Sequence, residues 1–215
     1  MKKNISRFHF ITHEGPGFSH VDLAEAACKG GADWIQLRVK DKGFDEWKSI
    51  ALDVIEVCEM YDAKLIVNDN VELAAQIRAY GVHLGKTDMD PVVARQILGE
   101  GPIIGGTANT FEDVLKLKKG NVDYIGLGPF RFTSTKKNLS PVLGFEGYQR
   151  IINRMVHEGI DIPVVAIGGI LKEDLNSLFS TGIHGVAISS SVSSEEDKEK
   201  ATTEFLKTIK KLGYA

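Results

Sequence analysis

The chain has 215 residues, of which 43% are hydrophobic, and its formal net charge is -3 at pH 7. This length and composition are enough to build one sizeable hydrophobic core. The near balance of charge argues against a dominant nucleic-acid-binding surface, so local basic clusters are better interpreted as sites for small anions.

The amino-terminal segment MKKNISRFHF is basic but has no continuous apolar stretch, so no signal peptide is predicted. No apolar run approaches the length of a membrane-spanning helix. Cys28 and Cys58 lie among apolar residues in predicted helices, and we expect both to be buried, reduced thiols. These features predict a soluble cytoplasmic protein without a membrane or nucleic-acid partner, and they leave a homo-oligomer open.

Short β-type runs alternate with longer amphipathic segments along the whole chain. The runs are mostly continuous in apolar residues, which is typical of parallel strands that are covered on both faces. The alternation repeats about every 20 to 25 residues, roughly the length of one βα unit, and about eight units fit. This count predicts a single-domain (β/α)8 TIM barrel over residues 1–215 rather than an open doubly wound sheet. The eight runs begin near Phe8, Trp34, Lys64, Gly81, Pro102, Asp123, Pro163 and Gly185.

Three of the predicted helices have recognisable ends. Residues 44–60 place an apolar stripe on one face, and Asp45 is the predicted N-cap. Thr110 is expected to cap a helix over residues 111–118, which has acidic residues in its first turn. Residues 195–212 are predicted to form a final helix that closes the ring.

In such a barrel the chemistry lies at the carboxyl ends of the strands. The second strand ends in Gln36-Leu37-Arg38-Val39-Lys40, in which Gln36, Arg38 and Lys40 share one parity and are expected to project to one side. Two cations and an amide at a barrel mouth suit a polyphosphate. A solvated strand end with a surface salt bridge is the alternative.

The third and fourth strands end in carboxylates. Asp69 follows Asn68, and Asp88 lies one βα unit later, so the two would sit on adjacent strand tips. A pair of aspartates that is completed by water and phosphate oxygens is typical of Mg2+ coordination. The alternatives are an Asx turn in which Asn70 or Asp69 caps the next helix. His83 is equally compatible with a catalytic role and with a satisfied histidine inside the barrel.

The later strand ends offer hydroxyl and glycine-rich segments. Thr107 on the fifth strand carries a hydroxyl, and the loop after the sixth strand holds Thr133-Ser134-Thr135 beside Lys136. Hydroxyls next to an ammonium group suit a phosphate. Gly168-Gly169 and Ser189-Ser190, at the seventh and eighth strands, suit a phosphate that is bound through backbone N–H groups, with a tight turn as the alternative.

These sites together indicate two phosphorylated substrates and a diphosphate leaving group. One site, on strands two to five, combines cations with carboxylates, and the other resembles a cup for a monophosphate. Neither a Ser-His-Asp nor a Cys-His arrangement is evident, and the sequence has no CxxC motif. No protein nucleophile is therefore predicted.

Over nearly its whole length the chain resembles the thiamine phosphate synthase family, also called thiamine-phosphate pyrophosphorylase. The motifs that carry the resemblance are Gln36-Leu37-Arg38-x-Lys40, Asn68-Asp69, Gly81-Val82-His83-Leu84-Gly85 with Asp88, Asp123-Tyr124-Ile125-Gly126-x-Gly128-Pro129, Thr133-x-Thr135-Lys136, Ala166-Ile167-Gly168-Gly169-Ile170 and Gly185-Val186-Ala187-Ile188-Ser189. The resemblance implies a TIM barrel that joins 4-amino-2-methyl-5-hydroxymethylpyrimidine diphosphate to a thiazole phosphate, or to its carboxylate. The products would be thiamine phosphate and diphosphate.

The resemblance also implies a role for each predicted site residue. The catalytic cations would be Arg38, Lys40 and Lys136, and Mg2+ would be held by Asp69 and Asp88. The pyrimidine diphosphate would contact Gln36, Leu37, Arg38, Val39, Lys40 and Asn68, and its diphosphate would also contact Thr107 and Lys136. The thiazole phosphate would be bound by Thr133, Ser134, Thr135, Gly169, Ile188 and Ser189.

Three positions depart from the family pattern, and three other functions compete. Val39 stands where glutamate is usual, Asn109 stands where the fifth strand motif has histidine, and Thr12-His13-Glu14 replaces a common Thr-Asp. The competitors are a thiazole tautomerase of the same superfamily, a non-catalytic barrel that binds phosphorylated metabolites, and a phosphosugar isomerase or epimerase. The tautomerase needs no diphosphate site, so the presence of Arg38, Lys40, Asp69, Asp88 and Lys136 favours the synthase. A binding barrel would need no pair of Mg2+ ligands, and an isomerase or epimerase would lack the second cluster of cations.

Overall fold

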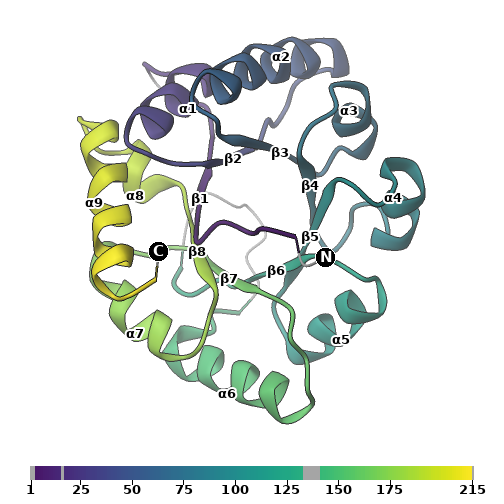
Figure 1. Ribbon diagram of the computed structural model, residues 1–215, viewed down its shortest axis with the longest axis vertical. Coiled ribbons are helices and arrows are strands. Elements are labelled where there is room, and N and C mark those ends of the chain that lie inside the picture. The colour runs from purple at the N-terminus through teal and green to yellow at the C-terminus, as the bar shows by residue number, and fades with distance from the viewer. Residues whose placement is uncertain (1–2, 16, 133–140, 215) are drawn as a thin grey trace.

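Eight parallel strands close into a barrel in the computed structural model, which describes residues 3–15, 17–132 and 141–214 (Figure 1). The strands follow chain order around the barrel, and β8 pairs with β1. The predicted barrel is therefore confirmed. The strands are β1 Phe8–Ile11, β2 Trp34–Leu37, β3 Lys64–Asn68, β4 Gly81–Leu84, β5 Ile103–Ala108, β6 Tyr124–Leu127, β7 Val164–Ile167 and β8 Gly185–Ile188.

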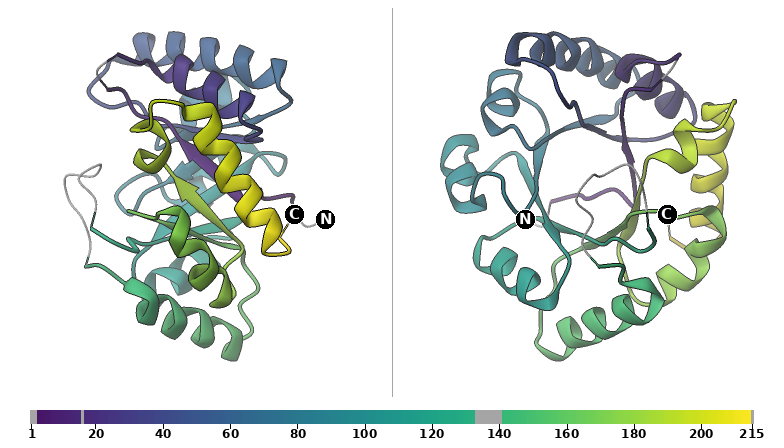
Figure 2. Two further views of the ribbon diagram at one scale, coloured as in Figure 1. Left: turned by 90° about the vertical axis from the view of Figure 1, so that its left-hand side faces the viewer. Right: turned by 180° about the vertical axis from the view of Figure 1, so that it is seen from behind.

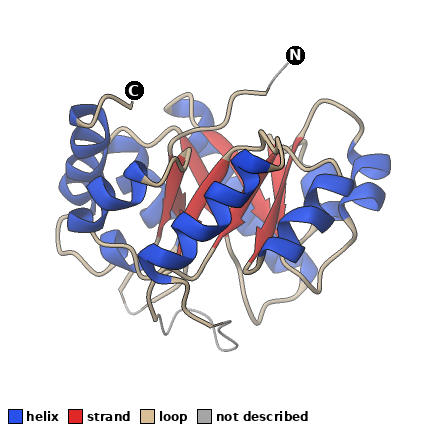
Figure 3. Cartoon of the chain, turned by 90° about the horizontal axis from the view of Figure 1, so that it is seen from below, coloured by secondary structure: helices blue, strands red, loops and turns tan. Residues whose placement is uncertain are grey.

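Helices form a ring around the strands (Figure 2). The segments that lead to the two chain ends lie on the same side of the barrel, so the carboxyl ends of the strands open on the other side (Figure 3). The helices are α1 His20–Lys29, α2 Phe44–Met60, α3 Val71–Gln76, α4 Pro91–Leu98, α5 Phe111–Lys119, α6 Gly144–His157, the 3-10 turn Lys172–Asp174, α7 Leu175–Ser180, α8 Ser190–Ser193 and α9 Lys198–Lys211.

The helix ends confirm one predicted cap and correct another. Thr110 caps α5 as predicted, because its side chain accepts a hydrogen bond from the backbone N–H of Asp113. The prediction that Asp45 caps α2 was wrong, since the N-cap is Gly43 and no side chain caps this end. Asp45 instead lies in the first turn, where its charge complements the positive end of the helix dipole.

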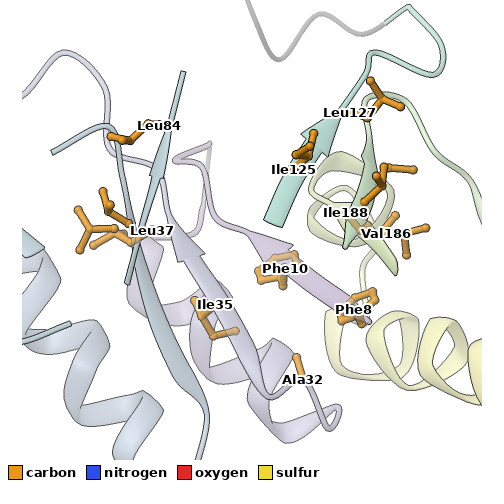
Figure 4. Close-up of a cluster of buried hydrophobic side chains, with 14 of the residues drawn as sticks. Phe8, Phe10, Ala32, Ile35, Leu37, Leu84, Ile125, Leu127, Val186 and Ile188 are labelled. Carbon is orange, nitrogen blue, oxygen red and sulfur yellow. The ribbon is translucent and has the colours of Figure 1, made fainter. Parts of the chain in front are cut away.

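Two apolar layers explain why the strands have continuous apolar sequences. Side chains such as Phe8, Phe10 and Leu37 lie in the core cluster between the strands and the helices, as Figure 4 shows. Alternate residues such as Trp34 and Tyr124 form a second cluster inside the barrel. Both faces of each strand are therefore buried, as the sequence pattern predicted.

The strand register brings polar residues together at one end of the barrel interior. Asn68 on β3 pairs with His83 on β4, and His83 pairs with Gly105 on β5. Thr107 lies two residues after Gly105 on the same strand and pairs with Gly126 of β6. These side chains thus lie next to one another just below the carboxyl ends of the strands.

Two further expectations concern membranes and thiols. Among the helices of the described residues, none has both the length and the apolarity that crossing a membrane requires. Cys28 and Cys58 are buried free thiols, as predicted.

Candidate active site

A cavity of about 520 Å3 opens at the carboxyl ends of the strands. It brings together predicted site residues from six strand ends that are far apart in sequence. Thr133, Ser134, Thr135 and Lys136 lie outside the described residues. The predicted residues in its lining are Gln36, Arg38, Lys40, Asn68, Asp69, Asp88, Thr107, Gly169, Ile188 and Ser189.

Two predicted contact residues do not line the cavity. Leu37 and Val39 are buried in the core, with 0% and 2% of their surface exposed. β2 ends at Leu37, yet Arg38 and Lys40 in the following segment still face the cavity with Gln36. The predicted parity is therefore correct, and it directs Leu37 and Val39 away from a substrate.

Arg38 places a cation in the cavity wall that has no side-chain partner among the described residues. Its backbone N–H donates to Thr12 Oγ1 at 3.3 Å, but its guanidinium makes no hydrogen bond or ion pair with another described residue. Burial lowers the pKa of this side chain, although nearby Asp69 opposes the shift. A half-buried guanidinium whose donors are not used by any described residue is well suited to bind an anion.

Asp69 and Asp88 form a carboxylate pair in the same wall. Asp69 lies in the left-handed backbone region with φ 65°, and its Oδ2 accepts from Lys40 Nζ at 2.6 Å. Burial, then hydrogen bonding to Asp69, raises the pKa of Asp88 to about 6. Burial opposes a low pKa at Asp69, but its contacts with Asp88 and Lys40 lower it.

This donor set fits a magnesium ion. Two hard oxygen ligands converge, and a dication would relieve the repulsion between their charges. In the described part of the chain, no group of three or more His, Cys, Asp or Glu side chains is placed to hold a metal. The remaining ligands would thus be water and phosphate oxygens, which Mg2+ commonly keeps.

The neighbouring Asn70 resolves the alternative for this strand end. Its Oδ1 accepts from the backbone N–H of Leu73 at 2.9 Å and caps α3. The Asx-type interpretation therefore holds for Asn70, while Asp69 faces the cavity.

A glycine turn and a serine segment form the opposite wall. Gly168 and Gly169 have φ values of 97° and 66°, which glycine adopts without strain. The hydroxyl of Ser189 donates to the carbonyl of Ile11 at 2.8 Å, so its proton is already used within the protein. An anion at this wall would therefore meet backbone N–H groups rather than the Ser189 hydroxyl.

His13, which departs from the family pattern, supports this wall from behind. Its Nδ1 lies 2.9 Å from Ser189 Oγ. Because the Ser189 proton is used by Ile11, Nδ1–H of His13 is the donor in this contact. The residue thus ties the end of β1 to the end of β8.

Arg131 also has a structural role. Its guanidinium forms two hydrogen bonds with Asp174, at 2.8 and 2.9 Å, and a third with the carbonyl of Gly169 at 2.7 Å. Arg131 is therefore not a freely solvated charge. It fixes the glycine turn of the second wall.

The sequence model of the thiamine monophosphate synthase family matches residues 8–192. The chain belongs to this family. It is 50% identical over 197 residues to the thiamine-phosphate synthase of Bacteroides fragilis, covering 92% of this chain and 97% of that protein. The thiamine-phosphate synthase of Bacteroides thetaiotaomicron is 48% identical over 197 residues, with 92% and 94% coverage.

A solved structure supports the same assignment. Thiamine phosphate pyrophosphorylase from Pyrococcus furiosus superposes with a TM-score of 0.84 at 34% identity, covering 96% of each chain. The family and fold that the sequence predicted are confirmed, and with them the enzyme class, a transferase of thiamine biosynthesis.

The cavity of this thiamine monophosphate synthase barrel also contains two polar residues, Lys86 and Asn109, to which the sequence had assigned no substrate contact. Lys86 lines the cavity and pairs with Asp113 at 2.9 Å. Lys86 could have been found from the sequence, because it lies in the same strand-end segment as Asp88. Asn109 also lines the cavity, and its Nδ2 donates to the carbonyl of Gly128 at 2.5 Å. Asn109 therefore holds the β5 and β6 ends together where the family usually has histidine.

Proposed function

We propose that the chain condenses 4-amino-2-methyl-5-hydroxymethylpyrimidine diphosphate with a thiazole phosphate, or its carboxylate, in a Mg2+-dependent reaction that yields thiamine phosphate and diphosphate. One observation carries this proposal: the same cavity has, on one wall, an arginine without a partner among the described residues beside a carboxylate pair, and a glycine-rich turn on the other wall. Each wall suits one of the two phosphorylated substrates.

The bond changes need no protein nucleophile. The bond between the pyrimidine methylene carbon and the diphosphate oxygen breaks, and its electron pair leaves on the diphosphate. The aminopyrimidine ring stabilises the resulting methylene cation. The thiazole nitrogen then donates its lone pair to that carbon, forming the C–N bond.

The protein's part in this reaction is electrostatic. Arg38 and Lys40 would neutralise the negative charge that grows on the departing diphosphate, which lowers the barrier more than it stabilises the bound substrate. Lys136, by resemblance, would act in the same way. Gln36 would be held for the pyrimidine by Asn68, since its Nε2 donates to Asn68 Oδ1 at 2.7 Å.

Asp69 and Asp88 would hold the magnesium ion. When bound, Mg2+ would supply a Lewis acid that compensates the charge of the diphosphate oxygens. Lys40 already contacts one oxygen of Asp69, so it would orient this carboxylate while its own charge stays close to the leaving group.

The second wall would receive the thiazole phosphate. Backbone N–H groups near Gly169, Ile188 and Ser189 would bind it, and Thr133, Ser134 and Thr135 would complete the site by resemblance. Cytoplasmic location and a homo-oligomer stay predictions from the sequence.

Release of diphosphate in the presence of both substrates tests the proposal. We expect turnover that requires Mg2+ and stops with a chelator. Asp69→Asn should reduce turnover by roughly 100-fold, since it removes a metal ligand while keeping the side-chain shape. Lys64→Met is the matched control, because Lys64 pairs with exposed Asp62 outside the cavity and its loss should leave turnover unchanged.

Each other outcome identifies a competing function. A well-folded wild type that binds both phosphorylated compounds without turnover would favour a binding barrel. Interconversion of thiazole tautomers without diphosphate release would favour the tautomerase. Undiminished turnover in Asp69→Asn would contradict the magnesium site.

A further inference from the structure

A chain of hydrogen bonds runs beneath the cavity from Tyr124 through His83 to Thr107. The hydroxyl of Tyr124 on β6 lies 2.9 Å from Nδ1 of His83 on β4. Nε2 of His83 lies 3.0 Å from Oγ1 of Thr107 on β5. His83 and Thr107 line the cavity, while Tyr124 is buried below them with 1% of its surface exposed.

Two glycines make room for the rings of this chain. A Cβ atom at Gly105 would lie 2.2 Å from Cζ of Tyr124. A Cβ atom at Gly126 would lie 2.8 Å from Cε1 of His83. Real Cβ atoms do not approach other atoms this closely, so the two rings can occupy these positions only beside glycine. The barrel interior is thus shaped around these two side chains.

The buried phenol determines the direction of the hydrogen bonds. Burial raises the pKa of Tyr124 well above its usual value, so the phenol keeps its proton. Among the described residues, its only hydrogen-bond partner is Nδ1 of His83. His83 would carry a proton on Nδ1 if it were the other neutral tautomer or the imidazolium. In both cases the buried O–H of Tyr124 would lose its acceptor, which is unfavourable.

The remaining protons follow from this assignment. Tyr124 donates to Nδ1, so the neutral imidazole of His83 carries its proton on Nε2. That Nε2–H donates to Oγ1 of Thr107. The proton of Thr107 is then not used by His83, and it is available to a group in the cavity that its side chain lines.

We propose that Tyr124 and His83 are positioning residues that make the hydroxyl of Thr107 a hydrogen-bond donor to the diphosphate. The role at the diphosphate rests on the proposed function. The Thr107 hydroxyl is held in this direction before the reaction begins. Its hydrogen bond to the leaving group therefore strengthens as negative charge develops there. Its contribution is therefore expected in kcat more than in KM.

Nitrogen-15 NMR of the histidine side chains tests the direction without any catalysis. We expect His83 in the wild type to be neutral with its proton on Nε2, and His83→Gln assigns its signals by their loss. In Tyr124→Phe the donor to Nδ1 is gone, so the Nδ1–H tautomer should gain population. A wild-type His83 that is protonated on Nδ1, or on both nitrogens near pH 7.5, would overturn the relay.

A kinetic double-mutant cycle tests the effect on the reaction. Tyr124→Phe and Thr107→Val should each lower kcat roughly tenfold, the scale of one hydrogen bond to a charged group. The double variant should lose no more than Thr107→Val alone, because Tyr124 acts through Thr107. Tyr148→Phe is the matched control, since it removes another buried phenol hydroxyl, which donates to the carbonyl of Leu127 and accepts from the backbone N–H of Ile167 at 3.2 Å, both of them outside the chain of hydrogen bonds from Tyr124 to Thr107. It should leave kcat unchanged.

The two experiments fail in different ways. Losses that multiply to about a hundredfold in the double variant would show that Tyr124 does not act through Thr107, and the relay would be overturned. Wild type without diphosphate release would count against the proposed reaction and against a role at the diphosphate. In that case the NMR signals would still decide the direction of the hydrogen bonds.

Discussion

Replacement of Arg38 by methionine should lower activity without lowering the stability of the ligand-free protein. The guanidinium has no described protein partner, and its burial lowers its pKa, which shows that the charged form is disfavoured there. Two charged hydrogen bonds to a diphosphate would contribute about 3 kcal/mol together, at the low end of the usual range. We therefore expect kcat/KM to fall by about 100-fold.

Arg95→Met is the matched control, which we expect to lower stability and to leave activity unchanged. Arg95 lies beyond the other end of the barrel, where it donates to the carbonyl of Pro102 at 2.6 Å and pairs with Asp123 at 2.7 Å. Its side chain is 13% exposed. Among the described residues, Lys3 at 3.2 Å would then be the one remaining ionic partner of Asp123. The loss should cost about 2 to 3 kcal/mol, or roughly 4 to 10 °C in Tm, with turnover unchanged.

Two measurements separate the variants. Diphosphate release at low substrate concentration gives kcat/KM, and thermal denaturation without ligands gives Tm. A third, denaturation with Mg2+ and diphosphate, should show a smaller ligand-induced rise in Tm for Arg38→Met than for the wild type. Turnover of Arg38→Met within threefold of wild type, or a fall in Tm as large as that of Arg95→Met, would refute the assignment of Arg38 as a substrate-binding cation.

Three further changes test the local structure. Gly105→Ala should destabilise the fold by about 2 kcal/mol or more in urea denaturation, because its Cβ would clash with Tyr124. Burial lowers the pKa of His20 to about 4, whereas an unfolded histidine titrates near 6.5. The unfolded state binds more protons between these values, so stability should fall by up to about 3 kcal/mol as the pH drops from 6.5 to 4. His20→Asn should flatten that dependence. Asp69→Asn should be more stable than Asp69→Ala by about 1 kcal/mol, because asparagine tolerates the left-handed backbone at φ 65° better.

The fold was predictable because its pattern is local and repeated. Each strand of this barrel is covered on both faces, so each reads as a continuous apolar run, and the number of runs gave the number of strands. The parallel arrangement then placed every strand end at one side of the molecule. Residues as distant in sequence as Gln36 and Ser189 were therefore expected at the same end of the barrel, and both line one cavity there.

The roles of individual side chains needed coordinates. Sequence parity could not show that the Ser189 proton is directed to Ile11, because that acceptor is a backbone carbonyl on another strand. The partners of His83 depend on space left by two glycines on neighbouring strands. The cap of α2 is Gly43 rather than Asp45, since the backbone of the preceding segment, and not side-chain preference, sets where the helix begins.

The two ends of the barrel differ in how their charges are compensated. At the amino-terminal end, Arg95 and Lys3 share Asp123, whose carboxylate also accepts from the backbone N–H of Ile104 at 2.7 Å. At the opposite end Arg38 lacks a described partner, and Asp69 combines a strained backbone with an adjacent carboxylate. Unpaired charge and backbone strain lower the stability of a fold, and they are typical of sites where a bound ligand compensates them. Left-handed backbone also occurs at Asp62, Arg78 and Asn121, before strands β3, β4 and β6, so strain alone does not mark the site. The combination of a cation without a described partner and two adjacent carboxylates around one cavity is the energetic argument that binding and catalysis occur there.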